Sequence, residues 1–448
     1  MNLTSKISGS TAISSSSIHH LPHESSYILK PALRGLAKRM VYRLMNYKIL
    51  DGFTDNEIFC ILDAMYDLLK PAPAFIRIPA PVIIFGDTHG QFTDLLRIID
   101  KVGTPPKSRY LFLGDYCDRG RKSIEILMLL FCLKLQNPSH VQILRGNHEC
   151  TKMNRLYGFY EECRRARGTQ MWKKFQKVFN ELPLCCLVAD RIITMHGGIS
   201  PDIKGMETLY KLKKPHTHAE CDTGVALDLM WSDPAAGADS CCSWQFNKMR
   251  NASWMFGTES VKDFCRLLNI DMIVRAHEVC RNGHMFYCDK LLCTVFSAPN
   301  YCGTDGNCAS VMKVSEDLKY SFITFKPKLD KNSLSKEKLA ELEKQSKNAD
   351  VKSPNPTLHK TVLPDRTHEV HEKAKTSPPQ TTAMQTTQTT TIISPSSSLS
   401  SISSEPNTKR STATPPTATL IPTPTTKSTS DNSVTAVTTP TTSTGSIT

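Results

Sequence analysis

Six residues that can bind metal ions occur where short apolar runs of this chain end: Asp87, His89, Asp115, Asn147, His196 and His277. None of them offers sulfur, so the set suits a hard or borderline divalent ion such as Mn, Fe or Zn, and not a thiolate-bound structural zinc. Six ligands are more than one ion needs if it keeps an open position for water. Two ions that share one carboxylate would use all six.

Two arginines, Arg119 and Arg145, follow two of the same runs. A guanidinium group can bind two phosphate oxygens through parallel hydrogen bonds. Each motif alone also fits a structural role, because Asp and Gly are common in turns and a buried His is often only a satisfied core residue. Their joint occurrence favours a site for hydrolysis of a phosphate ester.

Buried strands are expected to position these residues. The apolar runs have the length and the aliphatic composition of strands, and each ends at a motif; they are 82–85, 110–113, 141–144, 191–194 and 271–274. Helical periodicity at 91–102 and 121–135 connects the first three runs, and strand patterns dominate after residue 182. Thr54 and Glu57 form a capping box for a helix that reaches about residue 70. The sequence therefore predicts a mixed α/β fold with the site on loops at strand ends.

Several motifs resemble the metal-dependent serine/threonine protein phosphatases in order and spacing. They are GDTHG (86–90), GDYCDRG (114–120), RGNHE (145–149), HGG (196–198), RAH (275–277) and SAPNYCG (297–303). NRLYGFYEEC (154–163) and LMWSDP (229–234) make the type-1 catalytic subunit the most similar branch, and the resemblance covers 30–326. It implies a calcineurin-like metallophosphoesterase sandwich of two mixed β-sheets flanked by helices.

The resemblance divides the six ligands between two divalent ions, Mn or Fe/Zn. It implies Asp87, His89 and Asp115 on one ion, and Asp115, Asn147, His196 and His277 on the other. Asp115 is then the bridging carboxylate.

The resemblance also implies catalytic roles. His148 resembles the general acid that protonates the departing serine or threonine oxygen, and Asp118 resembles the carboxylate that orients it. Arg119 and Arg250 resemble the phosphate clamp, with Tyr301 nearby. Hydrolysis would be a single displacement without a phosphoenzyme.

The chain departs from type-1 relatives around this site. The segment 235–248 stands where relatives carry an acidic stretch and has one carboxylate, Asp239. Met249-Arg250-Asn251 stands in place of their Asp-Arg-Gly, and Thr304-Asp305-Gly306 replaces an acidic and aromatic run. Fewer carboxylates beside a phosphate site predict a preference for less basic substrates.

Five apolar residues resemble the pocket through which type-1 phosphatases bind the RVxF-like strand of regulatory subunits, namely Ile192, Met272, Phe286, Leu318 and Phe322. The same residues also fit ordinary strand positions. The resemblance favours a docking pocket with altered preference.

Composition divides the chain into three parts. Residues 1–26 are rich in Ser, and the last aromatic residue is Phe325. Between 376 and 448, 48 of 73 residues are Ser, Thr or Pro, which is too little apolar surface to offset the entropy of ordering a chain. The sequence predicts a disordered segment 1–26, a catalytic domain 27–327 and a disordered tail 328–448.

Composition also restricts the location and the partners. No apolar stretch has the length of a membrane span, the start lacks the apolar region of a secretory signal, and the 16 cysteines include no CxxC pair. These features predict reduced, mostly buried thiols in the cytoplasm or nucleus. The net charge is +13, but the Lys and Arg residues are scattered, which favours phosphoprotein partners over nucleic acid.

Three functions fit the sequence. The first is a protein phosphatase acting on phosphoserine and phosphothreonine. The second is a catalytically silent scaffold that binds phosphatase regulators, although no ligand or clamp residue is missing. The third is a metallophosphoesterase with a non-protein substrate.

Overall fold

The computed structural model describes residues 27–235, 240 and 243–328. All of them belong to the first of two compact units, Met1–Glu372. The predictions of disorder for 1–26 and for the tail after residue 328 lie outside the described residues. Within the described part, no helix combines the length and the apolar composition needed to cross a membrane.

Helices and strands alternate in the first half of this unit. The α-helices are α2 (Pro31–Tyr47), α3 (Asp55–Leu69), α4 (Phe92–Val102), α5 (Ser123–Gln136), α6 (Thr151–Leu156), α7 (Phe159–Arg167), α8 (Thr169–Phe179), α9 (Met206–Tyr210), α10 (His218–Cys221), α11 (Gly224–Trp231) and α12 (Thr258–Leu268). Short 3-10 helices are η1 (Asn147–Glu149), η3 (Cys288–Lys290) and η4 (Tyr301–Gly303). The predicted helices agree with α3, α4 and α5 within two residues, and the Thr54–Glu57 capping box is present.

The strands form two mixed sheets and one small sheet. They are β1 (Phe75–Ile78), β2 (Val82–Phe85), β3 (Tyr110–Phe112), β4 (Val141–Ile143), β5 (Cys185–Val188), β6 (Ile192–Met195), β7 (Asp233–Pro234), β8 (Trp244–Phe246), β9 (Trp254–Phe256), β10 (Met272–Arg275), β11 (His284–Tyr287), β12 (Leu292–Val295), β13 (Ala309–Val314) and β14 (Tyr320–Phe325). One sheet has the order β1-β5-β6-β10-β12-β11 and the other the order β14-β13-β2-β3-β4. The predicted sandwich of two mixed sheets is confirmed.

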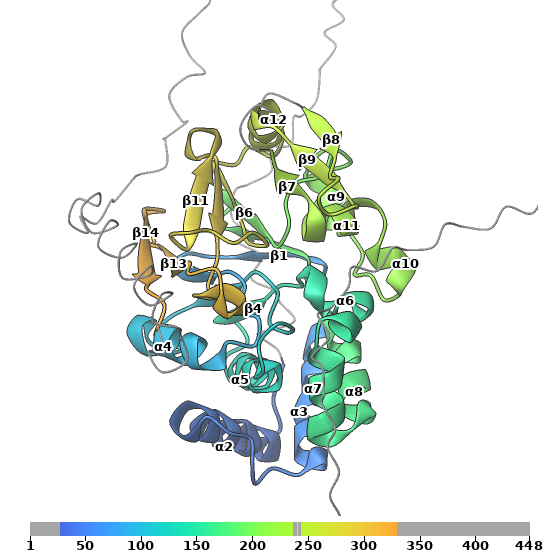
Figure 1. The fold of residues 1–448 in the computed structure, drawn as a ribbon, viewed down its shortest axis with the longest axis vertical. Helices are drawn as coiled ribbons and strands as arrows, with labels where there is room; N and C mark the ends of the chain where they lie inside the picture. Colours follow the sequence, from blue (N-terminus) through green and yellow to red (C-terminus); the bar gives the residue numbers. More distant parts are fainter. Residues whose placement is uncertain (1–26, 236–239, 241–242, 329–448) are drawn as a thin grey trace, which may run out of the picture. The chain divides into compact units, whose positions relative to one another are not determined.

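The five strands of the predicted apolar runs are buried on both faces, which explains why these runs are continuous. In β2, Ile84 packs into the core between the two sheets, whereas Ile83 and Phe85 face a second core shared with α2 to α5, α7 and α8. In β6, Ile192 faces the central core and Ile193 faces a third core with α11 and α12. Strands buried on both faces need apolar residues at every position. Figure 1 shows the two groups of helices on opposite sides of the strands.

The small sheet was not predicted. Its order is β7-β9-β8, and its strands have only two or three residues each. β7 lies within LMWSDP, and β8 and β9 flank the segment that contains Arg250. Such short strands carry no measurable alternation, so sequence periodicity could not reveal them.

Candidate metal centre

The six predicted ligands come together where strands of both large sheets end. Asp87, Asp115 and Asn147 follow the parallel strands β2, β3 and β4. His196 and His277 follow β6 and β10, which are parallel in the other sheet. A single β-bridge between Asp87 and Phe296 joins the two sheets at this edge. Parallel strands deliver their carboxyl ends to one edge, so the topology itself assembles the cluster.

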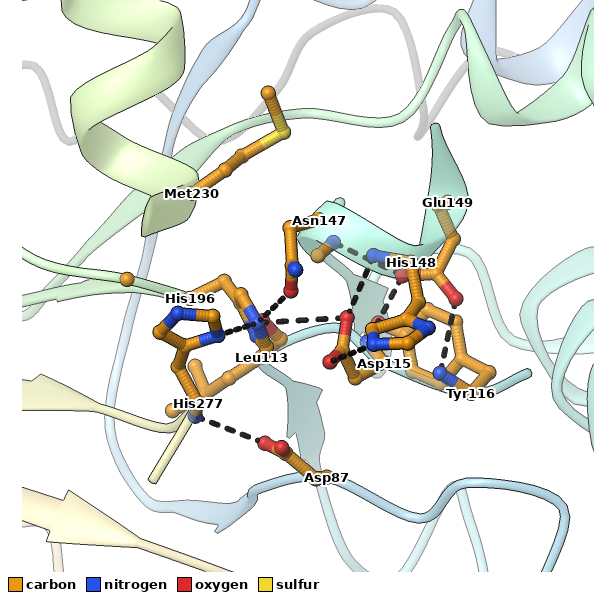
Figure 2. A network of polar contacts seen from close by, with 12 residues as sticks. Asp87, Leu113, Asp115, Tyr116, Asn147, His148, Glu149, His196, Met230 and His277 are labelled. Carbon is orange, nitrogen blue, oxygen red and sulfur yellow. Dashed lines mark hydrogen bonds and ion pairs between the residues drawn. The ribbon is translucent and has the colours of Figure 1, made fainter. Parts of the chain in front are cut away.

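Asp115 lies at the centre of the cluster. Its Oδ2 atom is 3.3 Å from His89 Nε2, and its Oδ1 atom is 3.4 Å from His196 Nε2. Among the described residues, two groups have ligand atoms close enough to hold an ion. One is His89, Asp115 and His148, and the other is Asp115, His196 and His277. Asp115 is common to both, which is the position that a bridging carboxylate requires. Figure 2 shows Asp115 between His196 on one side and His148 on the other.

The remaining predicted ligands complete the cluster. Asp87 Oδ2 lies 3.6 Å from His89 Nε2, and Asp87 Oδ1 accepts a hydrogen bond of 3.0 Å from the His277 backbone N–H. The Asn147 side-chain amide lies 2.9 Å from His196 Nε2. All six residues are buried.

Backbone carbonyl groups fix which imidazole nitrogen faces the cluster. His89 Nδ1 donates to Cys117 O at 2.8 Å and His196 Nδ1 donates to Leu113 O at 3.1 Å, so each presents Nε2. His277 is different because its Nδ1 faces His196 Nε2 at 3.1 Å. Its Nε2 is buried without a hydrogen-bond partner among the described residues. In His89 and His196, the nitrogen that faces away from the cluster donates a hydrogen bond, which is typical of histidines that bind metals.

The electrostatics of the cluster fit a divalent cation. Burial opposes protonation of His89, yet Asp115 and Asp87 raise its pKa well above the usual value, so these buried carboxylates attract positive charge. Burial and the charge of Arg250 hold the pKa of His277 well below the usual value, which leaves the neutral imidazole that a ligand must be. Two buried carboxylates with imidazole and amide donors are a set that suits divalent metal ions.

Left-handed backbone conformations are concentrated in the site loops. His89, Asp115, Asp118, Arg119 and His277 have φ values of 39°, 56°, 71°, 67° and 68°. Such conformations cost free energy in non-glycine residues and persist only where the surrounding structure enforces them. Gly114 and Gly146 permit the left-handed conformation of Asp115, because a Cβ atom on Gly114 would lie 2.5 Å from the Gly146 backbone.

Glu149 locks two of the motifs together. Its buried carboxylate accepts hydrogen bonds from the backbone N–H groups of Asp115, Tyr116 and Gly146 at 2.8–3.0 Å. The sequence reasoning assigned Glu149 no role. The available signal was a Glu close to the end of the predicted buried strand 141–144. A carboxylate is buried only where hydrogen bonds satisfy it, so such a residue indicates a structural role.

His148 and Asp118 form the predicted pair. His148 Nδ1 donates to Asp118 Oδ2 at 2.6 Å, and Asp118 Oδ1 accepts from the Phe159 backbone N–H at 2.8 Å. His148 Nε2 therefore points to the cluster, 3.9 Å from Asp115 Oδ2. This orientation suits proton transfer at Nε2.

Arg119, Arg250 and Tyr301 line the same pocket as the metal cluster, which has a volume of about 970 Å³. The Arg119 guanidinium stacks 4.1 Å from the Tyr157 ring centroid. The Tyr301 ring lies 5.1 Å from His89. The structure thus brings together the six predicted ligands, the His148–Asp118 pair, Arg119, Arg250 and Tyr301, but not Arg145.

Asp233 positions Arg250 and was missed by the sequence reasoning. Its Oδ2 accepts from Arg250 Nε at 2.8 Å, and its Oδ1 accepts from the buried Arg275 at 2.7 Å. Burial alone would raise the pKa of Asp233, but the positive charges of Arg275 and Arg250 hold it well below the usual value. Asp233 lies in LMWSDP. This motif indicated the most similar branch of the family but gave no role for Asp233.

The suggestion that Arg145 meets phosphate is wrong. Its guanidinium is buried and donates to Pro215 O at 2.6 Å, Glu149 O at 3.2 Å and Asn180 Oδ1 at 3.0 Å. Through these hydrogen bonds, the Arg145 side chain connects three segments of the chain behind the pocket. Local sequence could not show this, because Pro215 and Asn180 are distant in the chain.

Comparisons with known proteins agree with this geometry. Residues 80–281 match the calcineurin-like phosphoesterase family. A candidate serine/threonine-protein phosphatase of Caenorhabditis elegans is 45% identical over 311 residues, which are 69% of this chain and 68% of that protein. Serine/threonine-protein phosphatase PP1-delta of Caenorhabditis elegans is 46% identical over 255 residues, 57% of this chain and 82% of the relative.

A solved structure shows the same similarity. The protein serine/threonine phosphatase from Saccharomyces cerevisiae with similarity to human phosphatase PP5 superposes with a TM-score of 0.59 at 29% identity, over 65% of this chain and 96% of that one. Fold and site define a calcineurin-like metallophosphoesterase whose His and Asp groups imply divalent metals. Within that class, the chain belongs to the serine/threonine-protein phosphatase family and is similar to its type-1 members.

Proposed function

We propose that this protein hydrolyses phosphoserine and phosphothreonine monoesters in proteins. The observation that carries the proposal is one pocket lined by five of the six ligands, His148, Arg119 and Arg250. The sixth ligand, His196, contacts Asp115 from behind the lining, and Asp118 holds His148 in the same way. The named relatives are serine/threonine-protein phosphatases, which supports the same substrate class.

The cluster would hold two divalent ions, with Mn or an Fe/Zn pair as the proposed metals. Asp87, His89 and Asp115 would bind one ion, and Asp115, Asn147, His196 and His277 the other. When bound, such a pair lowers the pKa of a water molecule and neutralises phosphate charge.

His148 would supply the proton that the departing alkoxide needs. Because Nδ1 donates to Asp118, the second proton of the imidazolium lies on Nε2, on the pocket side. The Asp118 carboxylate stabilises this imidazolium and fixes the plane of the ring. The proton moves from Nε2 to the serine or threonine oxygen as its bond to phosphorus breaks.

Arg119 and Arg250 would bind the phosphate oxygens. Arg250 approaches the pocket with Nε held by Asp233 and with Nη2 3.4 Å from His277 O, so its orientation is set before substrate arrives. Tyr157 holds Arg119 in the same way through its ring face. Groups held in place before binding lose little entropy when they bind substrate.

Exposed apolar side chains around the pocket favour a peptide over a small phosphate ester. Leu156, Phe246 and Met249 line the pocket and are 72%, 51% and 90% exposed. We define these three residues as the apolar rim. A phosphopeptide can cover the rim with residues beside the phosphorylated one, whereas a small phosphate ester has no groups that could do so.

Phosphate release from a phosphoserine peptide by the full chain, with and without added Mn, tests the proposal. We expect metal-dependent turnover that falls at least 100-fold in His148→Ala. His140→Ala is a matched control, because His140 lies in the turn before β4 and is not part of the pocket lining. Metal-loaded protein that binds the peptide without releasing phosphate would support the scaffold function instead.

We also propose docking of regulatory subunits at Ile192, Met272, Phe286, Leu318 and Phe322. All five belong to or pack against one core cluster, and β11 and β14 are the edge strands of their sheets (Figure 1). Ile192 and Met272 are fully buried, so Phe286, Leu318 and Phe322 would make the contact. Binding of an RVxF peptide that is lost in Phe322→Asp and kept in Leu156→Asp would test this site.

We propose that residues 27–327 form the catalytic domain and that the protein acts in the cytoplasm or nucleus. Most described cysteines are buried, as expected for thiols kept reduced. Imaging of a tagged full chain tests the location.

A further inference from the structure

A buried amide holds the backbone of the proton donor from behind the pocket. Asn154 lies in α6, is fully buried, and is the first residue of the NRLYGFYEEC motif. Its side-chain amide donates to the backbone carbonyl oxygen of His148 at 3.1 Å, and its backbone N–H donates to Cys150 O at 3.1 Å. Helix α6 is therefore held against η1, the short helix that contains His148.

Helix α8 fixes the orientation of this amide. Trp172 Nε1 donates to Asn154 Oδ1 at 2.8 Å, and Asn154 Nδ2 also donates to Gln176 Oε1 at 3.2 Å. An indole N–H can only donate, so the amide oxygen must face Trp172 and the NH2 group must face His148 O. Trp172 and Gln176 are four residues apart in α8 and lie on the same face of that helix. Any other orientation of the Asn154 amide would lose these buried hydrogen bonds.

The hydrogen bond from Asn154 is one of three that set the direction of the His148 ring. The His148 backbone N–H donates to Asp115 Oδ1 at 3.0 Å, and its Nδ1 donates to Asp118 Oδ2 at 2.6 Å. The Cys117 sulfur lies 3.3 Å from His148 O, but a thiol is a weak donor. The Asn154 amide is therefore the main donor that holds the carbonyl side of His148.

Loss of this bond would let the His148 backbone shift while the ring stays bound to Asp118. The proton leaves from Nε2, which points to the cluster and lies 3.9 Å from Asp115 Oδ2. A general acid must lie about 2.6–3.2 Å from the atom that it protonates. A displacement of about 1 Å is therefore enough to lower the rate of proton transfer.

We propose that Asn154 is a positioning residue for the proton donor. Its amide connects the His148 backbone to α8 and keeps Nε2 directed at the departing oxygen. The effect of Asn154 on turnover rests on the proposed phosphatase function. Its effect on the orientation of the His148 ring does not.

Two variants and one control test this role. Asn154→Ala removes the hydrogen bond to His148 O, and Trp172→Phe removes only the indole N–H that fixes the amide. Asn46→Ala is the matched control, because Asn46 Nδ2 also donates to a backbone carbonyl, Tyr42 O at 2.8 Å, but lies on the exposed side of α2 and outside the pocket lining.

The first measurement is kcat of each Mn-loaded full chain for a phosphoserine peptide and for an aryl phosphate whose leaving group needs no proton. We expect kcat for the peptide to fall roughly tenfold in Asn154→Ala and roughly threefold in Trp172→Phe, with kcat for the aryl phosphate within about twofold of native protein. KM and metal content should not change. An equal loss of kcat on both substrates would show a role in stability alone and would overturn the proposal.

A double-mutant cycle sharpens this measurement. In the His148→Ala background, Asn154→Ala should have no further effect on peptide turnover, because both changes act on the same proton transfer. The same loss of kcat with and without His148 would overturn the proposal.

The second measurement needs no turnover. The short hydrogen bond from His148 Nδ1 to Asp118 is expected to give a downfield proton NMR resonance in the Zn-loaded full chain, identified by its absence in His148→Ala. This resonance should shift or broaden in Asn154→Ala and stay unchanged in Asn46→Ala. An unchanged resonance in Asn154→Ala would overturn the proposal, whereas native protein that releases no phosphate would contradict only the phosphatase function. If Asn154→Ala does not fold, Trp172→Phe decides by the same measurements.

Discussion

The metal centre and the apolar rim share one pocket but are built in opposite ways. Asp118 and His196 are fully buried, and each is fixed by two partners, whereas Met249 is 90% exposed. A change at the centre leaves a buried polar group without its partner, which costs far more than the loss of an exposed contact. The centre therefore fixes the chemistry, and the rim can vary to select substrates.

The largest loss of turnover is expected at Asp115, which belongs to both groups of metal ligands. Asp115→Asn should lower turnover on the order of 10⁴-fold, more than His89→Ala, because it weakens the attachment of both ions. Phosphate release and metal content after dialysis check this. Two ions retained in Asp115→Asn would contradict the bridging assignment.

The next effect concerns the proton donor. His148→Ala should lower kcat roughly 10²- to 10³-fold with metal content unchanged, and Asp118→Asn roughly 10- to 100-fold, because Asp118 acts through the imidazole. An aryl phosphate whose leaving group needs no proton should be much less affected. Equal losses on both substrates would show that His148 has another role.

A smaller loss of kcat/KM is expected at Asp233, the residue that positions Arg250. Asp233→Asn should lower kcat/KM roughly 10-fold, since Arg250 and Arg275 lose a shared carboxylate. Asp263→Asn is the matched control, because Asp263 is exposed and pairs with Arg266 outside the pocket lining. If Asp233→Asn behaves like the control, Arg250 does not depend on Asp233.

At the rim, only substrate preference should change. Met249→Asp should lower KM for a basic phosphopeptide roughly three- to tenfold and leave turnover of a small aryl phosphate unchanged. The comparison of the two substrates checks this in one preparation. A loss of aryl phosphatase activity would mean that the rim is coupled to the centre.

A change outside both regions should affect stability alone. Burial raises the pKa of Glu162 to about 7, partly opposed by a hydrogen bond from the Ile124 backbone N–H. The unfolded chain ionises this group near 4.3, so its contribution to stability falls as pH rises from about 4.5 to 7. Glu162→Gln should therefore be more stable than native protein at pH 8, by roughly 1–2 kcal/mol, and should lose this advantage at pH 4.5.

Urea unfolding at the two pH values checks this. Glu161→Gln is the control, because neighbouring Arg164 and Arg165 lower the pKa of Glu161 to about 2 and its contribution has the opposite sign. The same stability difference at both pH values would contradict the Glu162 assignment.

The sequence predicted the two-sheet sandwich and all six ligands because that information is local. Each ligand lies within four residues of the end of an apolar strand, and parallel strands place their carboxyl ends at the same edge of a sheet. The left-handed φ values of residues such as Asp115 and His277 were not predictable, because the surrounding contacts impose them.

The errors share one physical cause. Arg145 was interpreted as a phosphate ligand, and Glu149 and Asp233 were given no role. In each case the partner atoms belong to segments that are distant in the chain, such as Pro215 for Arg145 and Arg250 for Asp233. A sequence motif identifies the charged residue but not the direction in which its side chain points.

Metal stoichiometry measured together with activity is the sharpest test for a two-ion hydrolytic centre in this protein. The full chain, purified without added metal, is loaded with Mn, freed of excess ion, and assayed for bound metal and for phosphoserine-peptide hydrolysis before and after chelation. We predict two ions per chain, loss of hydrolysis on chelation, and recovery when Mn is restored. Full activity in a metal-free protein would show that hydrolysis does not depend on a two-ion centre.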